Sequence, residues 1–361
     1  MVMKMNNVNN LSKSENVRFF GRTARIESFD AVWFNWSGSG FVFSFYGTRA
    51  DCHFYSAVNG ENVPPPESRA FIGVYIDDVP YQTARFELKQ NSEWITLAEE
   101  LPMGRHTVYV IKETEVAYGR AAVGEISVDG ELLPPPPPPK LKLEFIGDSI
   151  TCGYGNICSN ASPDFVTREE NFSQTYAAIS SRMLGAELSV VAASGNGFFH
   201  DYGCNSHNLI PELYPYTDKF LHEHYGMLPE EWDFSADRSD AVIVKLGAND
   251  YQYCSGADLS EEQRSSETLS QRKKEFCGVA SDFLRQITLY RPNTPVLLVY
   301  ETDMGLKNKL IEAVKIANCG IHTLEISPKR EREGVGANGH YSVCTHARVA
   351  AEVANAIKKL L

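Results

Sequence analysis

Short apolar segments separated by turn residues dominate the first third of the chain. The segments 41–46 (FVFSFY), 71–77 (FIGVYID) and 107–112 (TVYVIK) are rich in β-branched and aromatic residues, which favour strands. Alternation along the first of them places its three phenylalanines on one face. This region therefore predicts an all-β sandwich or jelly roll.

Trp33 and Phe34 are adjacent, and adjacent residues of a strand point to opposite faces. Some aromatic surface is therefore expected outside the core of the sandwich, where it could meet a second domain, another copy of the chain or a sugar. Because an exposed aromatic surface suits self-association, we expect a homo-oligomer.

The hydrophobic pattern changes at six consecutive prolines, residues 134–139. Such a run cannot join a helix or a central strand and forms a stiff polyproline II linker. Beyond it, apolar runs of strand length alternate with helical patterns, which is typical of a three-layer α/β domain. These runs begin at Leu141, Leu188, Ala241, Pro295 and Ile321. We therefore expect a β-sandwich domain over 1–133, the linker over 134–139 and an α/β domain over 140–361.

The first three of these runs end in turns that carry candidate chemistry. Ser149 follows the first run, Gly195 the second and Asn249 the third. Because the carboxyl ends of neighbouring parallel strands form the usual ligand crevice, we expect these residues to lie together. Ser149 has the place of a nucleophile, and its backbone N–H, that of Gly195 and the Asn249 carboxamide are suited to hold an oxyanion. Asp148 and Asp250 are interpreted as structural.

A serine nucleophile needs a base, and His340 lies in the glycine-rich loop 338–342 just before the last helical pattern. His346 lies on the apolar stripe of that helix and is interpreted as a half-buried structural histidine. For His200, which follows the second turn, a structural role and a role at the substrate edge are equally open. We therefore predict a catalytic Ser149–His340 pair.

The four blocks around Ser149, Gly195, Asn249 and His340, in this order, resemble the SGNH (GDSL) hydrolases. Within that superfamily the chain is most similar to carbohydrate esterase family 2, whose members remove acetyl groups from plant polysaccharides and carry a β-sandwich ahead of the hydrolase domain. Segments of the first domain share this resemblance, namely 20–23 (FGRT), 36–40 (WSGSG), 45–48 (FYGT) and 112–115 (KETE). The resemblance implies a flavodoxin-like SGNH-hydrolase domain preceded by a jelly-roll sandwich.

The chain departs from that family at Asn338, two residues before His340, where members generally carry an aspartate. An amide cannot stabilise an imidazolium as a carboxylate does, although an amide or a backbone carbonyl can still orient the ring. Asn338 is therefore a candidate for orienting His340, and the third member of the catalytic group stays open.

The resemblance implies a serine esterase that removes O-acetyl groups from plant polysaccharide or oligosaccharide, an acetyl xylan esterase, through an acyl-enzyme at Ser149. Such chemistry needs no cofactor and no metal. One alternative is another short-chain carboxylesterase, lysophospholipase or thioesterase of the superfamily. A second, motivated by Asn338, is a non-catalytic carbohydrate-binding protein.

Aromatic residues near the four blocks could form a platform on which a sugar ring of the substrate stacks. The candidates are Tyr154, Phe198, Tyr251 and Tyr341.

Composition limits the partners. The 361 residues carry a formal charge of −12, which argues against nucleic acid and anionic membrane surfaces. The first 25 residues contain no unbroken apolar core of signal-peptide length, and no later run approaches a membrane span, so we expect a cytoplasmic protein. The eight cysteines are irregularly spaced, so we expect thiols and no metal site; a bridge between Cys152 and Cys158 would need an oxidising compartment.

Overall fold

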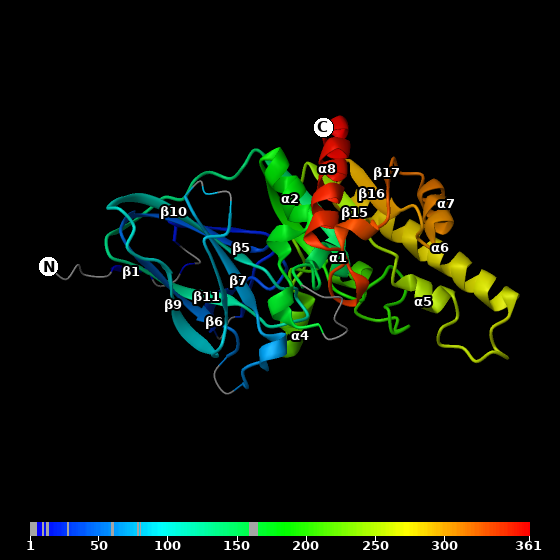
Figure 1. Ribbon diagram of the computed structural model, residues 1–361, viewed down its shortest axis with the longest axis horizontal. Coiled ribbons are helices and arrows are strands. Elements are labelled where there is room, and N and C mark those ends of the chain that lie inside the picture. The colour runs from blue at the N-terminus through cyan, green and yellow to red at the C-terminus, as the bar shows by residue number, and fades with distance from the viewer. Residues whose placement is uncertain are drawn as a thin grey trace.

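The computed structural model describes residues 6–8, 11, 14–26, 29–58, 61–77, 79, 81–158 and 165–361. Figure 1 shows two units packed side by side, antiparallel sheets formed before the prolines and an α/β unit formed after them. The predicted fold class, a sandwich followed by a three-layer α/β domain, is confirmed. Residues 134–139 contain no helix or strand.

Two antiparallel sheets of six strands build the first unit. One has the order β3-β4-β11-β6-β9, with β1 paired to β11, and the other the order β12-β5-β10-β7-β8, with β2 paired to β5. Phe41, Phe43 and Phe45 of β5 are fully buried in the core of the sandwich, as their alternation predicts. The strands are β1 (Asn6–Val8), β2 (Val17–Phe20), β3 (Ala24–Ile26), β4 (Phe29–Trp33), β5 (Gly40–Gly47), β6 (Ala50–Tyr55), β7 (Phe71–Ile76), β8 (Ala84–Glu87), β9 (Ser92–Ala98), β10 (Gly104–Lys112), β11 (Ala122–Val128) and β12 (Glu131–Leu133).

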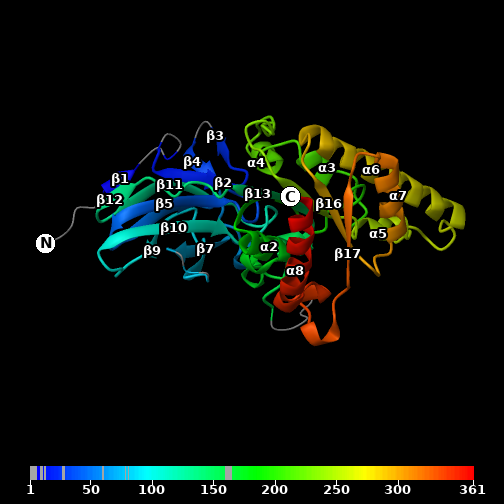
Figure 2. The ribbon, with the colours of Figure 1, turned by 90° about the horizontal axis from the view of Figure 1, so that it is seen from above.

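Five parallel strands form the sheet of the second unit, in the order β14-β13-β15-β16-β17. Helices α2 and α8 cover one face and α3, α6 and α7 cover the other (Figure 2). The strands are β13 (Leu141–Gly147), β14 (Ala186–Ala192), β15 (Ala241–Lys245), β16 (Val296–Glu301) and β17 (His322–Ile326). The helices are α1 (Ser149–Cys152), α2 (Tyr176–Leu184), α3 (Ile210–Leu213), α4 (Lys219–His224), α5 (Asp250–Cys254), α6 (Ser266–Tyr290), α7 (Lys307–Ala317) and α8 (Val343–Leu360). None of the described helices has the length and apolar character needed to cross a membrane.

Local sequence explains these elements. Because helices cover both faces of the parallel sheet, its inner strands are mostly apolar and buried. All five residues of β15 are buried, including Lys245 at its end. Helix α8 carries Val349, Val353 and Ile357 at helical spacing, and all three are buried against the sheet. Helix α2 begins after Thr175, whose side chain caps it, and ends at Gly185 in the left-handed conformation.

The two domains share a buried interface. Trp36 of the sandwich has no exposed surface, packs in the core of the α/β domain, and donates its indole N–H to the carbonyl of Thr217 at 2.8 Å. Trp33 is also fully buried and packs with Leu221 and Tyr225, on or next to α4. The aromatic surface predicted outside the sandwich core therefore meets the second domain. A homo-oligomer stays a prediction. The aromatic surface that motivated it is buried against the second domain and therefore does not support it.

No disulfide forms among the eight cysteines, all of which lie in the described residues. The bridge weighed between Cys152 and Cys158 is therefore not made. Cys152 is fully buried on α1, whereas Cys158 lies in the loop beyond it, partly exposed. The fold consequently depends on packing, hydrogen bonds and ion pairs rather than on cross-links.

A buried ion cluster connects the sandwich to the middle of the parallel sheet. Glu144 on β13 has no exposed side-chain surface and accepts from Arg291 Nε at 2.8 Å, from Arg22 at 3.2 Å and from the Tyr214 hydroxyl at 3.1 Å. Arg22 comes from the sandwich and also donates to the carbonyls of Tyr214 and Tyr216, both at 2.6 Å. Although burial alone would raise it, the two arginines hold the pKa of Glu144 below its ordinary value.

Replacing Glu144 with glutamine removes the counter-charge of two buried arginines, so we expect the free energy of unfolding to fall by about 3–5 kcal/mol. The control is Glu312→Gln, because Glu312 pairs with Lys309 at 2.7 Å on the exposed side of α7 and should contribute less than about 1 kcal/mol. Guanidinium chloride unfolding measures both. Equal, small losses would contradict the role assigned to the Glu144 cluster.

Candidate active site

Strand register brings the three candidate turns to one edge of the parallel sheet. The last residue of β13 pairs with the last residue of β14 on one side and with that of β15 on the other. Ser149, Gly195 and Asn249 each follow the end of their strand within four positions. The structure therefore brings these three predicted residues to neighbouring strand ends, in the crevice where ligands bind to such sheets.

The turn that carries Ser149 is tight. Ser149 is the first residue of α1, and Asp148 caps this helix by accepting from the Ile150 N–H at 3.0 Å. A Cβ on Gly147 would lie 2.0 Å from Thr151 Oγ1, so only glycine fits there. Asp148 thus has the structural role expected from the sequence.

The two ring nitrogens of His340 form hydrogen bonds, one with the Ser149 hydroxyl and the other with a backbone carbonyl. Its Nε2 lies 2.9 Å from Ser149 Oγ, and its Nδ1 lies 3.0 Å from the carbonyl oxygen of Ala337. The carbonyl can only accept, so Nδ1 carries the proton and Nε2 is free to accept from the serine hydroxyl. Burial, aided by the charges of Lys329 and Lys245, holds the pKa of His340 below its ordinary value.

The candidate role of Asn338 as the orienting group is wrong in this structure. Its side chain is exposed and donates to the hydroxyl of Tyr154 at 3.0 Å rather than to the His340 ring. Asn338 has a φ of +49°, a left-handed conformation inside the short turn Ala337–Gly339. In this turn the carbonyl of Ala337, not the side chain of Asn338, is the partner of Nδ1.

Backbone contacts fix the histidine loop against the loop that follows α1. The Ala337 N–H donates to the carbonyl of Gly155 at 3.0 Å, and the Gly336 N–H donates to that of His340 at 2.9 Å. A Cβ on Gly155, whose φ is +57°, would lie 2.3 Å from the Ala337 Cβ. The sequence analysis did not single out Gly155 or Ala337, although the glycines at 153 and 155 signal close approach there.

The two other histidines near the site have structural roles. His346 is buried, and its Nδ1 accepts from the Tyr176 N–H at 3.0 Å at the start of α2. Burial lowers the pKa of His346 to about 3, so it stays neutral. His200 is 7% exposed and stacks on Tyr253 with ring centroids 3.5 Å apart, which favours the structural alternative.

Three hydrogen-bond donors at the strand ends are available to a ligand. Among the described residues, the backbone N–H groups of Ser149 and Gly195 have no acceptor. Gly195 has a φ of +75°, which glycine adopts without strain. Asn249 donates to the carbonyl of Asn196 at 2.7 Å, which uses one of the two N–H bonds of its carboxamide.

Asp250 holds in place the turn of residues 194–200 after β14. This turn carries Gly195, the candidate oxyanion donor, and is called the oxyanion turn. Its carboxylate accepts from three consecutive backbone N–H groups, those of Phe198, Phe199 and His200, at 3.0, 2.7 and 2.9 Å. Burial raises the pKa of Asp250 to about 6, although the three donors favour its ionised form. This is the structural role expected for Asp250.

Two of the four aromatic platform candidates are wrong. Phe198 is 1% exposed and packs edge-on against Phe276 and Phe283 in the core. Tyr341 is 1% exposed, and its hydroxyl donates to Glu301. Both rings are enclosed by the helices that cover the sheet, so neither can stack on a sugar.

Other aromatic rings border the site. The ring of Tyr154 lies 4.5 Å from that of His340, and Tyr251 is 45% exposed. Tyr202, which the sequence analysis did not single out, is 64% exposed, and its Cβ lies 3.9 Å from the place of a Cβ on Gly195. Phe165 stacks on the ring of Tyr154 with centroids 3.8 Å apart, whereas Tyr202 and Tyr251 are exposed and could contact a sugar.

A side chain from the sandwich reaches the oxyanion turn. Glu115, in the segment 112–115 after β10, accepts from the Ser194 N–H at 2.6 Å, directly before Gly195. Sequence reasoning missed this role because it included the segment only in a family resemblance. The first domain is therefore part of the support of the candidate site.

Together these groups are those of serine acyl transfer. Ser149 is bonded to a neutral histidine, and further N–H donors lie at the neighbouring strand ends.

Comparisons with known proteins agree with this geometry. A family model for the carbohydrate esterase 2 N-terminal region matches residues 19–137. A cellulase/esterase of Acetivibrio thermocellus is 28% identical over 90% of this chain and 37% of its own length. An acetylxylan esterase/glucomannan deacetylase of Cellvibrio japonicus is 26% identical over 50% of this chain and 49% of its own length. The matches thus span half or less of these relatives.

Solved structures resemble the whole chain. A family two carbohydrate esterase from Clostridium thermocellum, solved with cellohexaose, has a TM-score of 0.80 and 25% identity, covering 95% of this chain and 98% of that one. An acetyl xylan esterase from the rumen bacterium Butyrivibrio proteoclasticus has the same fold, with a TM-score of 0.84 at 19% identity over 99% of this chain and 98% of that one. Residues 19–137 thus match carbohydrate esterase family 2 in sequence, and the whole chain has the fold of solved esterases of that family.

Proposed function

We propose that this protein is a serine esterase that removes O-acetyl groups from plant polysaccharide or oligosaccharide. The observation that carries the proposal is the 2.9 Å hydrogen bond between Ser149 Oγ and His340 Nε2, at the edge of the sheet where unused N–H donors lie. The named activities of two relatives, acetylxylan esterase and glucomannan deacetylase, support the choice of an acetylated carbohydrate.

The mechanism follows from these positions. Ser149 Oγ attacks the acetyl carbonyl while His340 Nε2 takes the hydroxyl proton. The negative oxygen of the tetrahedral intermediate accepts from the N–H groups of Ser149 and Gly195 and from the Asn249 carboxamide. The bond between the acetyl carbon and the sugar oxygen then breaks, and His340 gives its proton to that oxygen, so that the sugar leaves with a free hydroxyl. Water, activated by His340, attacks the acetyl-serine, releases acetate and restores the enzyme.

The backbone carbonyl of Ala337 replaces the aspartate usual in the family. It holds His340 in the required tautomer but adds no full negative charge to stabilise an imidazolium. The asparagine at position 338, where the family generally has an aspartate, motivated the alternative of a non-catalytic binder. Because the carbonyl of Ala337 orients His340 instead, this asparagine no longer argues against turnover. A cytoplasmic location stays a prediction.

Acetate release from acetylated xylo-oligosaccharides tests the proposal directly. We expect turnover by the native chain, a loss of about a thousandfold or more in Ser149→Ala, and little activity on long-chain acyl esters or thioesters. Circular dichroism of the variant controls for folding. A preference for long acyl chains would favour a lysophospholipase or thioesterase, and glycan binding without turnover would favour a binder.

Asn249→Ala should lower kcat about a hundredfold to a thousandfold and change KM much less, because an oxyanion donor acts mainly in the transition state. Steady-state kinetics on a soluble acetyl ester measure both constants. An unchanged kcat would show that Asn249 only holds the carbonyl of Asn196.

Neutral His340 is the active form, so kcat/KM should fall as pH drops through its pKa. Because that pKa lies below its ordinary value, we expect the acid limb to have its midpoint below about pH 6.5.

Asn338→Asp should change kcat/KM at pH 7 by less than about threefold, since this side chain faces Tyr154. A rise of about tenfold or more, with an acid limb moved to higher pH, would identify residue 338 as the orienting group.

A further inference from the structure

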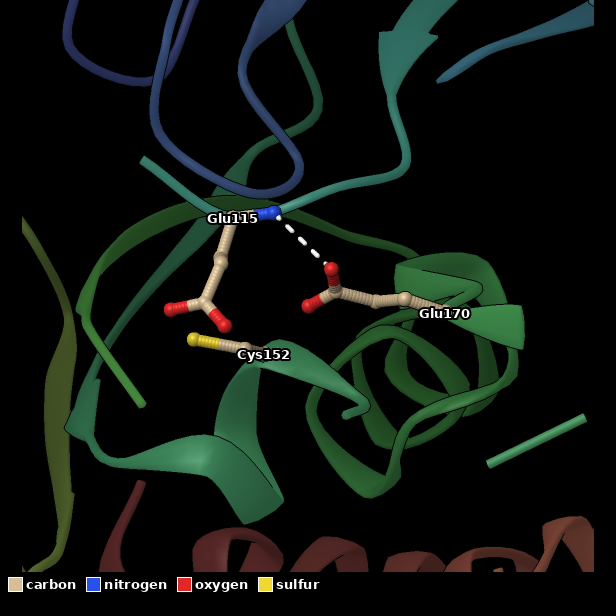
Figure 3. A group of neighbouring side chains, drawn as sticks. All are labelled: Glu115, Cys152 and Glu170. Carbon is tan, nitrogen blue, oxygen red and sulfur yellow. Dashed lines mark hydrogen bonds between the residues drawn. The ribbon is translucent and has the colours of Figure 1, made fainter. Parts of the chain in front are cut away.

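A second cluster of reactive side chains lies between the domains, apart from the Ser149–His340 pair. Glu115 comes from the sandwich, Cys152 is the last residue of α1, and Glu170 follows the short turn Thr167–Glu169. All three are buried, and one ligand atom from each lies within 4.8 Å of the others. Figure 3 shows the two carboxylates and the thiol pointing toward one another.

Each carboxylate has one oxygen that no nitrogen or oxygen of the described residues satisfies. Glu115 Oε2 accepts from the Ser194 N–H and Glu170 Oε2 from the Glu115 N–H, but Oε1 of both is buried without such a partner. Only the weakly donating thiol of Cys152 lies beside Glu115. Leaving charged oxygens buried and unpaired is costly, so the cluster calls for a further positive group.

The buried ammonium group of Lys112 does not fill this need. Lys112 is fully buried, and its ammonium group donates to three backbone carbonyls, those of Thr114 at 2.9 Å, Glu115 at 2.8 Å and Tyr118 at 3.4 Å. Within the described residues, no lysine or arginine nitrogen forms an ion pair with Glu115 or Glu170. Lys112 therefore offsets charge at a distance but leaves both Oε1 atoms unsatisfied.

The donor set identifies the ligand. Magnesium and calcium prefer six or more oxygen ligands, whereas a thiolate with two carboxylate oxygens suits zinc, which takes four ligands of mixed type. A fourth ligand is at hand, because Ser37 Oγ of the sandwich is buried without a nitrogen or oxygen partner and lies beside Cys152. With Cys152 as a thiolate, one Zn²⁺, the two carboxylates and the Lys112 ammonium sum to zero charge.

We propose that Glu115, Cys152 and Glu170 form a structural zinc site that ties the sandwich domain to the helix opened by Ser149. Zinc takes the place of the thiol proton and bridges ligands from both domains. Since Cys152 ends the same short helix that Ser149 begins, the metal fixes the position of the nucleophile without contacting the substrate.

Metal analysis of the full chain tests this. We expect about one zinc per chain after growth with zinc and desalting, and at least about a tenfold lower content in Cys152→Ser and Glu170→Gln. The matched control is Glu113→Gln, because Glu113 is buried in the same segment but its oxygens accept from Ser173 and Gln82. This control should keep its zinc. Chelation should therefore lower the melting temperature of the native chain and of Glu113→Gln, but not that of Cys152→Ser or Glu170→Gln.

Cobalt substitution gives a readout that needs no variant. Replacing zinc with Co²⁺ in the native chain should produce the intense near-ultraviolet absorption of a cobalt–thiolate bond, absent from Cys152→Ser. A native chain that takes up neither zinc nor cobalt would overturn the proposal and leave a proton shared by the two glutamates. A zinc content in Cys152→Ser and Glu170→Gln equal to that of the native chain would overturn the assignment to these residues.

Discussion

The parallel pairing of β13 with β14 on one side and β15 on the other is the constraint on which the site depends. Because the three strands end in register, the residues that follow them must emerge together at one edge. Gly147 permits the turn that presents Ser149 at that edge, and Asp250 anchors the neighbouring turn through three backbone N–H groups. The chemistry thus follows from sheet geometry, with loops adding only short, hydrogen-bonded extensions.

The sandwich domain belongs to this arrangement rather than standing apart from it. Arg22 reaches Glu144 in the middle of the parallel sheet, and Glu115 bonds the turn before Gly195. Trp36 packs inside the core of the α/β domain. A chain without the first domain would therefore lose support for both the sheet and the oxyanion turn, which accounts for the occurrence of the two domains as one packed unit.

Much of this could be predicted from the sequence, and what could not has a physical reason. The fold class and the positions of Ser149, Gly195 and Asn249 follow from apolar runs that end in turns, and the position of His340 follows from the glycine-rich loop before the last helical pattern. The orienting group escaped prediction because a backbone carbonyl, here of Ala337, has no sequence signature. Phe198 and Tyr341 look like site aromatics in sequence, yet burial beneath helices decides their role. Contacts between Glu115, Cys152 and Glu170 join distant segments, so no local pattern announces them.

The central claim concerns Ser149 as the nucleophile. His340, oriented by a backbone carbonyl, is its base, and N–H groups at three neighbouring strand ends donate to the oxyanion. A crystal structure of the chain after reaction with a serine-directed phosphonate tests this claim most directly. The account predicts phosphorus bonded to Ser149 Oγ, its free oxygen hydrogen-bonded to the N–H groups of Ser149 and Gly195 and to the Asn249 carboxamide, and His340 Nδ1 still on the Ala337 carbonyl. An adduct on another residue, or a free oxygen that touches none of these donors, would contradict it.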